Sequence, residues 1–443
     1  MRQAARVLAT ALCLSLIASL PARAVGLLRD PDIEHALNTI AAPILNAAGL
    51  GANRVKVLVV NESSLNAFVV DAEHIFIHAG LLSRLENASQ LQSVIAHEAA
   101  HIANGHMARR LTNMRTARTA AGIGLALAAA AAAGGEGRAA TGLALGTQSS
   151  AQRVLFAHTR AEEASADQAG VRYMVSAGIN PVGAVEVVDI FRGQEALSVS
   201  RQDPYTRTHP LTQDRFRALQ GFAAAYGDRA WPDATTANYW FARAQGKLTA
   251  FTRAPSWTLR RAKSSVTADI RLMREAVAYH RQPNARKAIA TIDKLASARP
   301  QDPFVHELRG QILLESRNFS PATNAYGRAV KLAPNDPLIL GGYGRSLLAL
   351  DTADSNKRAL AALEKARRID RYSAGVLRDL GMAYARAGQN GMASLVTAER
   401  YALRGRLNDA ALHAKRAEGL LPRGSAPWQR AQDVLTAAKA APK

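Results

Sequence analysis

The sequence predicts an α+β protein in two parts, a mostly helical domain with a small β-sheet followed by an all-α solenoid of helical repeats. A Val-rich alternating segment at 54–60 predicts a strand, and helical periodicity on both sides of it predicts the surrounding helices. A 34-residue unit at 303–336 predicts a repeat made of two helices. Because 443 residues are enough for two or three domains, we expect one domain at 25–250 and a second at 260–443.

The first 24 residues have the pattern of a secretory signal. Arg2 and Arg6 precede an apolar segment at 7–20, and the small residues of 22–24 (Ala-Arg-Ala) form a cleavage site. An uncleaved anchor is the alternative, but the apolar segment is short for a membrane span. We therefore expect export of the chain, with cleavage near Ala24.

Cysteine usage restricts the chemistry of any metal site. The single cysteine, Cys13, lies inside the predicted signal, so the exported chain would contain neither disulfides nor thiolate ligands. We therefore expect any metal to be held by histidines and carboxylates.

The net charge of +21 is concentrated in the second half of the chain. Residues 25–249 hold 20 Lys and Arg against 19 Asp and Glu, whereas residues 250–443 hold 33 against 16. This basic half predicts an acidic partner, either an anionic membrane surface or an acidic protein face. Nucleic acid also matches the charge, but the predicted export excludes it as a partner.

Local patterns predict the elements that precede residue 105. Apolar residues at helical spacing indicate helices, and short alternating segments rich in branched residues indicate strands. The elements are, in order, a helix at 32–48, a strand at 54–60, a hairpin made of 67–70 and 74–78, and a helix that begins near Gln90 after a cap at Asn87 or Ser89.

Residues 119–147 are dominated by Ala, Gly and Leu and predict a helical hairpin of low polarity. A helix that spans a membrane is disfavoured, because alanine contributes little to insertion. Two interpretations stay open: a buried Ala-rich hairpin, or a surface hairpin that touches lipid or covers a cleft. The flanking Arg115, Arg118 and Arg138 suit a peripheral membrane contact.

Helix pairs follow from about residue 269. In the unit at 303–336, Gly310, Ala322 and Tyr326 occupy the small and aromatic positions of a tetratricopeptide repeat. One such pair cannot bury its apolar face alone, so several pairs must stack. A generic helical bundle is the alternative. The concave face of a repeat solenoid binds protein segments, which predicts a recruiting role.

The functional interpretation depends on a motif within 94–104. Positions i and i+4 of a helix share a face, so His97 and His101 present two imidazoles to one metal ion. Glu98 is rotated by about 100° from His97, which places it beside a metal-activated water. Zinc lowers the pKa of such a water, and Glu98 would take its proton and pass it to a leaving amine. A surface helix with scattered histidines is the alternative, but this helix is apolar enough to be buried, where imidazoles need partners.

A third protein ligand has to come from elsewhere, because two histidines leave a zinc site incomplete. Glu163 and Asp167 lie four residues apart on a predicted helix. We expect Glu163 to bind the metal and Asp167 to accept the outer N–H of a ligand histidine, which fixes its tautomer. Glu162 is the rival ligand, although no carboxylate follows it four residues later. A solvated acidic helix face is the alternative interpretation.

These motifs, together with the segment 208–210 (Thr-His-Pro) and Arg215, resemble the M48 family of metallopeptidases. The likeness is greatest to the periplasmic members that carry C-terminal tetratricopeptide repeats. It covers residues 29–219 by motif and the repeats by architecture. The resemblance implies a zincin-type fold, in which a strand near the cleft pairs with extended substrate and 119–147 faces the membrane or covers the site. The Ala and Gly content of that segment weakens the membrane interpretation.

The same resemblance places His209 over the zinc, as a further ligand or as a group that stabilises the transition state. From the residues alone, a histidine before a proline is more simply a loop residue. His106 follows His101 by five residues and points away from the metal face, so we expect it to be structural or to support a ligand.

We therefore expect a periplasmic zinc endopeptidase, with one zinc ion per chain, that cleaves misfolded or misassembled envelope proteins. Outer-membrane β-barrels are the clients that the resemblance implies. The repeats would recruit clients or the outer-membrane assembly machinery and add chaperone activity, and an association with the outer membrane stays open. The alternative is a repeat-based chaperone or scaffold whose peptidase site is mostly autoinhibited.

Overall fold

The computed structural model describes residues 26–106, 109, 160–198, 201–227 and 229–440. Helices make up most of these residues, and the strands among them form a four-stranded sheet. The chain divides into two compact units, Gly26–Pro300 and the helices from Gln301 onward. The predicted fold class is confirmed, whereas the predicted signal at 1–24 and the hairpin at 119–147 lie outside the described residues.

The sheet has the strand order β1-β2-β4-β3. Its strands are β1 (Leu27–Leu28), β2 (Lys56–Val60), β3 (Ala67–Val69) and β4 (His74–His78). β2 runs parallel to β4, whereas β3 pairs antiparallel with β4 and places Ala67 opposite Ile77. The predicted hairpin is therefore present, and it leaves β3 at one edge of the sheet.

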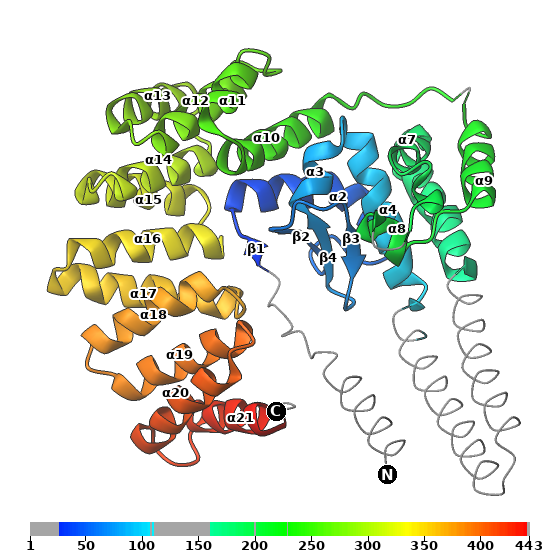
Figure 1. Cartoon of the computed structure of the whole chain (residues 1–443). Helices are drawn as coiled ribbons and strands as arrows, with labels where there is room; N and C mark the ends of the chain where they lie inside the picture. The colour runs from blue at the N-terminus through cyan, green and yellow to red at the C-terminus, as the bar shows by residue number, and fades with distance from the viewer. Residues whose placement is uncertain (1–25, 107–108, 110–159, 199–200, 228, 441–443) are drawn as a thin grey trace, which may run out of the picture. The chain divides into compact units, whose positions relative to one another are not determined.

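Three long helices pack around this sheet and form the core of the first unit: α2 (Pro31–Ala47), α4 (Ala88–Ala103) and α10 (Thr235–Thr252). α2 packs against β2, α4 and α10, and α4 packs against β3 (Figure 1). The core contains fully buried aliphatic side chains from helix and sheet, among them Leu37, Ile44, Val57, Ile75 and Leu91. Their burial is the main favourable term that holds α4 beneath the candidate site.

Capping residues fix where these helices begin. The side chain of Asp30 accepts hydrogen bonds from the backbone N–H groups of Asp32 and Ile33, both at 3.0 Å, and so caps α2. Asn87 accepts the backbone N–H of Gln90 at 2.9 Å. Of the two predicted caps of α4, the structure therefore uses Asn87.

Shorter elements complete the first unit. They are α3 (Ala79–Arg84), a helix at 160–176, α7 (Val182–Ile190), a 3-10 turn (Gln194–Ala196), α8 (Pro204–Thr208), α9 (Gln213–Ala224), α11 (Pro255–Ala262), α12 (Ala268–Arg281) and α13 (Ala285–Ala298). α10 packs against both α2 and α12, and Tyr239 on α10 donates its O–H to Asp269 on α12 at 2.7 Å. The predicted boundary at 250–260 lies inside this unit, and the predicted domain limits stay a prediction.

The second unit consists of helix pairs that stack in chain order (Figure 1). Its helices are α14 (Pro303–Glu315), α15 (Phe319–Leu332), α16 (Pro337–Leu350), α17 (Ala353–Ile369), α18 (Ala374–Arg386), α19 (Asn390–Leu403), α20 (Leu407–Leu420) and α21 (Ala426–Ala440). Tyr326 packs between two glycines: a Cβ on Gly310 would lie 2.6 Å from its ring, and a Cβ on Gly342 2.3 Å. These small residues let consecutive pairs approach, as the repeat pattern predicts.

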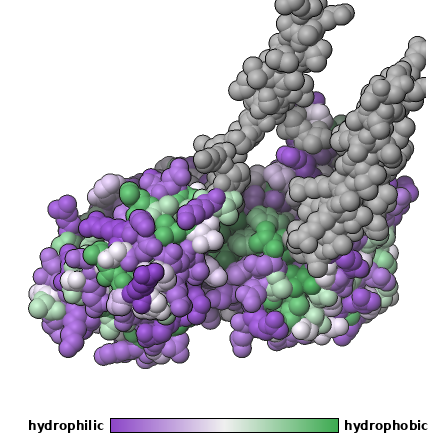
Figure 2. Space-filling view, turned by 90° about the horizontal axis from the view of Figure 1, so that it is seen from below, coloured by the Kyte–Doolittle hydropathy of each residue, from purple (hydrophilic) through white to green (hydrophobic). Residues whose placement is uncertain are grey.

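The surface drawn in Figure 2 is mainly hydrophilic, with apolar residues in separate patches. Among the described helices, none combines the length and the hydropathy that crossing a membrane requires.

Candidate metal centre

Helix α4 brings the two motif histidines together. His97 and His101 are one helical turn apart, and their Nε2 atoms lie 3.1 Å from each other. Both side chains are buried, with 6% and 2% exposure. Two imidazoles that face each other at this distance in the interior form half of a metal site.

Glu163 approaches these histidines from the helix at 160–176. Its Oε2 lies 3.2 Å from His97 Nε2, and its Oε1 lies 3.4 Å from His101 Nε2. The carboxylate is fully buried. Glu162 is also buried but is not part of this group, so the geometry favours Glu163 over its predicted rival.

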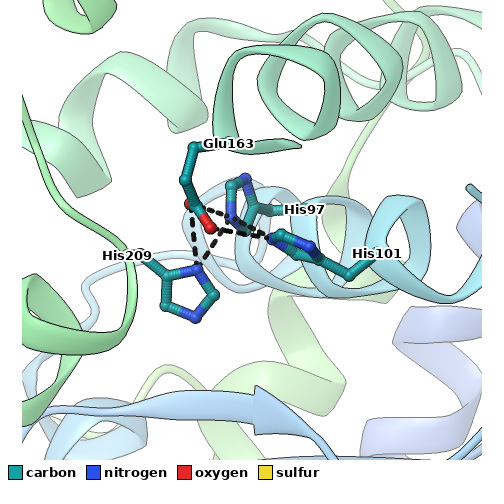
Figure 3. Close-up of side chains that lie close together, drawn as sticks. All are labelled: His97, His101, Glu163 and His209. Carbon is teal, nitrogen blue, oxygen red and sulfur yellow. Dashed lines mark hydrogen bonds and ion pairs between the residues drawn. The ribbon is translucent and has the colours of Figure 1, made fainter. Parts of the chain in front are cut away.

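His209 completes the group from the end of the short helix α8. Its Nδ1 lies 3.0 Å from Glu163 Oε2 and 3.2 Å from His97 Nε2. Figure 3 shows the four side chains, His97, His101, Glu163 and His209, pointing toward one common centre. The structure therefore gathers one residue that only the family resemblance had placed there.

The four residues fit a zinc ion by donor type and by spacing. Their ligand atoms all lie within 4.8 Å of one another, and the close contacts among them measure 3.0 to 3.4 Å. Donor atoms about 2.0–2.1 Å from a tetrahedral zinc ion are themselves about 3.3–3.4 Å apart. Three imidazoles and one carboxylate are also ligands that zinc accepts.

Glu98 lies beside this group without belonging to it. Its side chain is fully buried, and its Oε1 lies 3.4 Å from His209 Nε2. The position matches the predicted base, which has to be adjacent to the metal and not bound to it.

Asp167 holds His97 from the opposite side of the ring. Its Oδ1 lies 3.1 Å from His97 Nδ1, so Nδ1–H donates to the carboxylate and Nε2 is left to face the metal position. Arg215 donates from Nε and from one terminal nitrogen to both oxygens of Asp167, each at 2.8 Å. It also lies 3.3 Å from Glu163 Oε2. Sequence reasoning placed Arg215 only within a motif, because no spacing rule relates it to Asp167.

One further histidine and one tyrosine contact members of the same group. His106 Nδ1 lies 2.8 Å from His101 Nδ1, on the side of that ring away from Glu163, so it contacts a candidate ligand histidine. Tyr205 on α8 packs against the His209 ring with a centroid distance of 4.8 Å. Nothing in the sequence singled out Tyr205.

Burial and charge shift the titration of the site. Burial lowers the pKa of His97, but Asp167 and Glu163 outweigh it and raise the pKa to about 10. Burial raises the pKa of Glu163, but His209 and His97 hold it well below its usual range. Burial likewise raises the pKa of Asp167, while His97 and Arg215 lower it further than burial raises it. The metal-free site is thus a buried imidazolium between carboxylates, and a metal ion would replace the proton.

Residues 28–223 match the model of peptidase family M48. The chain is similar to the β-barrel assembly-enhancing protease of Yersinia pestis, with 24% identity over 217 residues, or 49% of this chain and 44% of that protein. It is also similar to the β-barrel assembly-enhancing protease of Escherichia coli strain K12, with 23% identity over 399 residues, or 87% of this chain and 78% of that protein.

Among solved structures, the chain is similar to YrrB, a TPR protein with an unusual peptide-binding site. The identity is 17%, the match covers 40% of this chain and 91% of that chain, and the TM-score is 0.32. Because this score is low, the repeats are assigned from their own stacked helix pairs.

Proposed function

The chain contains a peptidase domain of family M48, and on this premise we propose that it is a zinc-dependent endopeptidase. The observation that carries the proposal is the buried group of His97, His101, Glu163 and His209, with Glu98 beside it. Buried groups of this kind with shifted pKa values cluster at functional sites. We propose that the first three hold one zinc ion per chain, and that His209 is a movable fourth group.

The roles of the surrounding residues follow from their contacts. When bound, zinc would supply Lewis-acid chemistry, polarising a scissile carbonyl and lowering the pKa of water. Glu98 accepts a proton from the attacking water and delivers it to the leaving amine. Asp167 keeps the His97 tautomer fixed, and Arg215 holds Asp167 ionised through its two hydrogen bonds.

Substrate alignment would use the edge strand β3. β3 pairs with β4 on one side, so a segment of extended substrate can pair with the part of its other side that α8 and His209 do not contact. Ala67 on this strand already has its carbonyl oxygen 3.3 Å from His209 Nε2, which places the strand edge next to the candidate centre. An unfolded polypeptide is the substrate class that such an edge accepts.

The names of the relatives suggest which unfolded polypeptides are the substrates. Both curated relatives are β-barrel assembly-enhancing proteases, and we propose the corresponding role here: cleavage of misassembled outer-membrane proteins in the periplasm. The stacked helix pairs from Gln301 onward would recruit these clients or the assembly machinery. The excess of basic residues in the second half of the chain favours acidic surfaces on those partners.

One observation favours a second candidate function. With His209 Nδ1 inside the ligand group, the site has four protein donors, which is the closed arrangement of a structural zinc site. In that state the protein would serve as a chaperone or scaffold through its repeats. The two functions coexist if His209 leaves the site when substrate binds.

A Glu98→Gln variant tests the peptidase proposal. Proton transfer by a positioned side chain contributes about 10²–10⁴-fold, so cleavage of unfolded casein should fall by that factor. Elemental analysis should still find one zinc per chain, because Glu98 is not a proposed ligand. Glu162→Gln is the matched control, since Glu162 is a buried glutamate outside the ligand group, and it should cleave as the wild type does.

Two results would count against the proposal. Wild-type cleavage by Glu98→Gln would remove the proposed base, and protein that binds no zinc would remove the metal. Wild-type protein that holds zinc without cleaving, while His209→Ala cleaves, would establish the closed site of the second candidate.

A further inference from the structure

Helix α8 docks on three consecutive residues at the start of β3. The contacts join Tyr205 N–H to Leu65 O at 3.1 Å, Thr208 Oγ1 to Asn66 Oδ1 at 3.2 Å, and His209 Nε2 to Ala67 O at 3.3 Å. In each of the last two contacts, the two residues that meet are 142 positions apart in the sequence. The single hydroxyl hydrogen of Thr208 is shared between Asn66 and two carbonyls of α8 itself, those of Pro204 and Tyr205 at 3.0 and 3.1 Å. Because the three contacts run in step along both segments, they define one docked surface.

This docking matters because α8 cannot set its own position. It spans Pro204–Thr208, five residues, which is far shorter than a helix that is stable alone. The other three candidate ligands lie within longer helices, at 160–176 and in α4. His209 is therefore the one member of the group whose placement depends on what α8 touches.

Tyr205 holds the imidazole directly. Its ring lies 4.8 Å from that of His209, tilted by 35°, and it also stacks on Phe191 with a centroid distance of 4.7 Å. Tyr205 is 4% exposed and Phe191 is fully buried. The backbone N–H of His209 also donates to Tyr205 O at 2.7 Å. Aromatic stacking of this kind restricts how the His209 ring can turn.

The orientation of the ring decides what each nitrogen faces. Nδ1 faces Glu163 at 3.0 Å and His97 at 3.2 Å, whereas Nε2 faces Ala67 O and Glu98 Oε1 at 3.3 and 3.4 Å. A rotation of the ring would break all of these contacts together.

We propose that Tyr205 and Thr208 are positioning residues that hold His209 over the candidate ligand group. They act through the docking of α8 on the start of β3 and through the Tyr205 ring, and neither residue is one of the four candidate ligands. The relevance of this positioning to catalysis rests on the proposed function, but the placement of His209 can be measured without catalysis.

The first measurement is carbethoxylation of histidines by diethyl pyrocarbonate in metal-free protein, resolved by peptide mass spectrometry. His209 is 3% exposed and should react slowly in the wild type. In Tyr205→Leu and in Thr208→Val its rate should rise by about threefold or more, the change that one lost hydrogen bond or ring contact produces. Thr208 is exposed, so its substitution does not disturb the core.

Controls separate positioning from general loosening. The rates of His97 and His101 should stay at their wild-type values in both variants. Tyr205→Phe keeps the ring and should leave His209 protected. Thr249→Val removes a buried helix hydroxyl in α10, away from α8, and should change no rate at the site.

The second measurement is cleavage in a double-mutant cycle. In a His209→Ala background, Tyr205→Leu should have no further effect on kcat or KM, because a positioning residue acts only through His209. Equal acceleration of all the buried histidines, unchanged labelling of His209, or an undiminished effect of Tyr205→Leu without His209 would each overturn the inference. A wild type that never cleaves would overturn the proposed function and leave the labelling result standing.

Discussion

The contacts inside the first unit join residues that are farther apart in the sequence than the contacts inside the second unit. In the first unit, His97 meets His209 across 112 residues, and Arg243 pairs with Asp32 across 211 at 2.8 Å. In the second unit, a long contact such as Arg386 to the carbonyl of Leu348 spans 38 residues. A site built from distant segments needs all of them in place at once, whereas stacked pairs depend only on their neighbours.

The two units also bury different chemistry. The candidate centre buries carboxylates and cations whose desolvation cost is offset by close partners, with Arg215 among them. The repeats gain their stability from close packing, as where Tyr326 lies between Gly310 and Gly342. Loss of a buried charge should therefore act strongly at the candidate centre, and added volume should act strongly where the repeats pack around Tyr326.

The largest expected effect is the loss of the Arg215 side chain. Arg215→Leu leaves Asp167 buried without its cation, and breaking such a pair costs about 3–5 kcal/mol. Denaturant titration of metal-free protein measures the change. The matched control is Arg217→Leu, because Arg217 is 74% exposed and pairs with an exposed carboxylate, so its removal costs about 0–1 kcal/mol. Equal losses in the two variants would mean that the buried pair has no special role.

The next effect is a dependence of stability on pH in the metal-free protein. The pKa of His97 is raised from 6.5 to about 10, so its contribution is complete below pH 6.5 and is lost as the pH rises through 10. Between pH 7 and pH 9 the free energy of unfolding should fall by about 2–3 kcal/mol, because each unit is about 1.36 kcal/mol. His97→Gln should lack this slope, and zinc should abolish it by replacing the proton. A slope that persists in His97→Gln would assign it to another group.

The smallest effect belongs to the repeats. A Cβ at Gly342 would lie 2.3 Å from the Tyr326 ring, so Gly342→Ala overpacks the interface and should cost about 1–3 kcal/mol. Hydrogen exchange should speed up in peptides from α15 and α16. Zinc content and the exchange of α4 should not change. Gly419→Ala in α20, where an added Cβ would meet no atom within 4 Å apart from its chain neighbours and the backbone of its own helix, is the control. Loss of zinc in Gly342→Ala would show that the two units are not independent.

Sequence reasoning reached the parts of the site that depend on local geometry. His97 and His101 follow from helical spacing, and Glu163 with Asp167 from the same rule, since four residues make one turn. His209 was reached only through the family resemblance, because proximity across 112 residues has no local signature. The support of Asp167 by Arg215 and the docking of α8 on β3 are likewise tertiary contacts.

The fold shows the same division. The strand at 54–60, the hairpin and the helix pairs follow from patterns that each segment carries by itself. The extent of the first unit does not follow from local patterns, because α12 joins this unit through packing and through the hydrogen bond between Tyr239 and Asp269. Which helix packs on which depends on shape complementarity between segments that the sequence pattern does not specify.

Anomalous diffraction at the zinc edge from crystals of the zinc-loaded protein would locate the proposed zinc ion and its ligands. We predict a single zinc peak per chain, about 2.0–2.2 Å from nitrogen atoms of His97 and His101 and from a carboxylate oxygen of Glu163. His209 should be the fourth ligand in the closed state and should be absent from the coordination sphere when substrate is bound. A zinc peak elsewhere in the chain, or none at all in protein supplied with zinc, would contradict it.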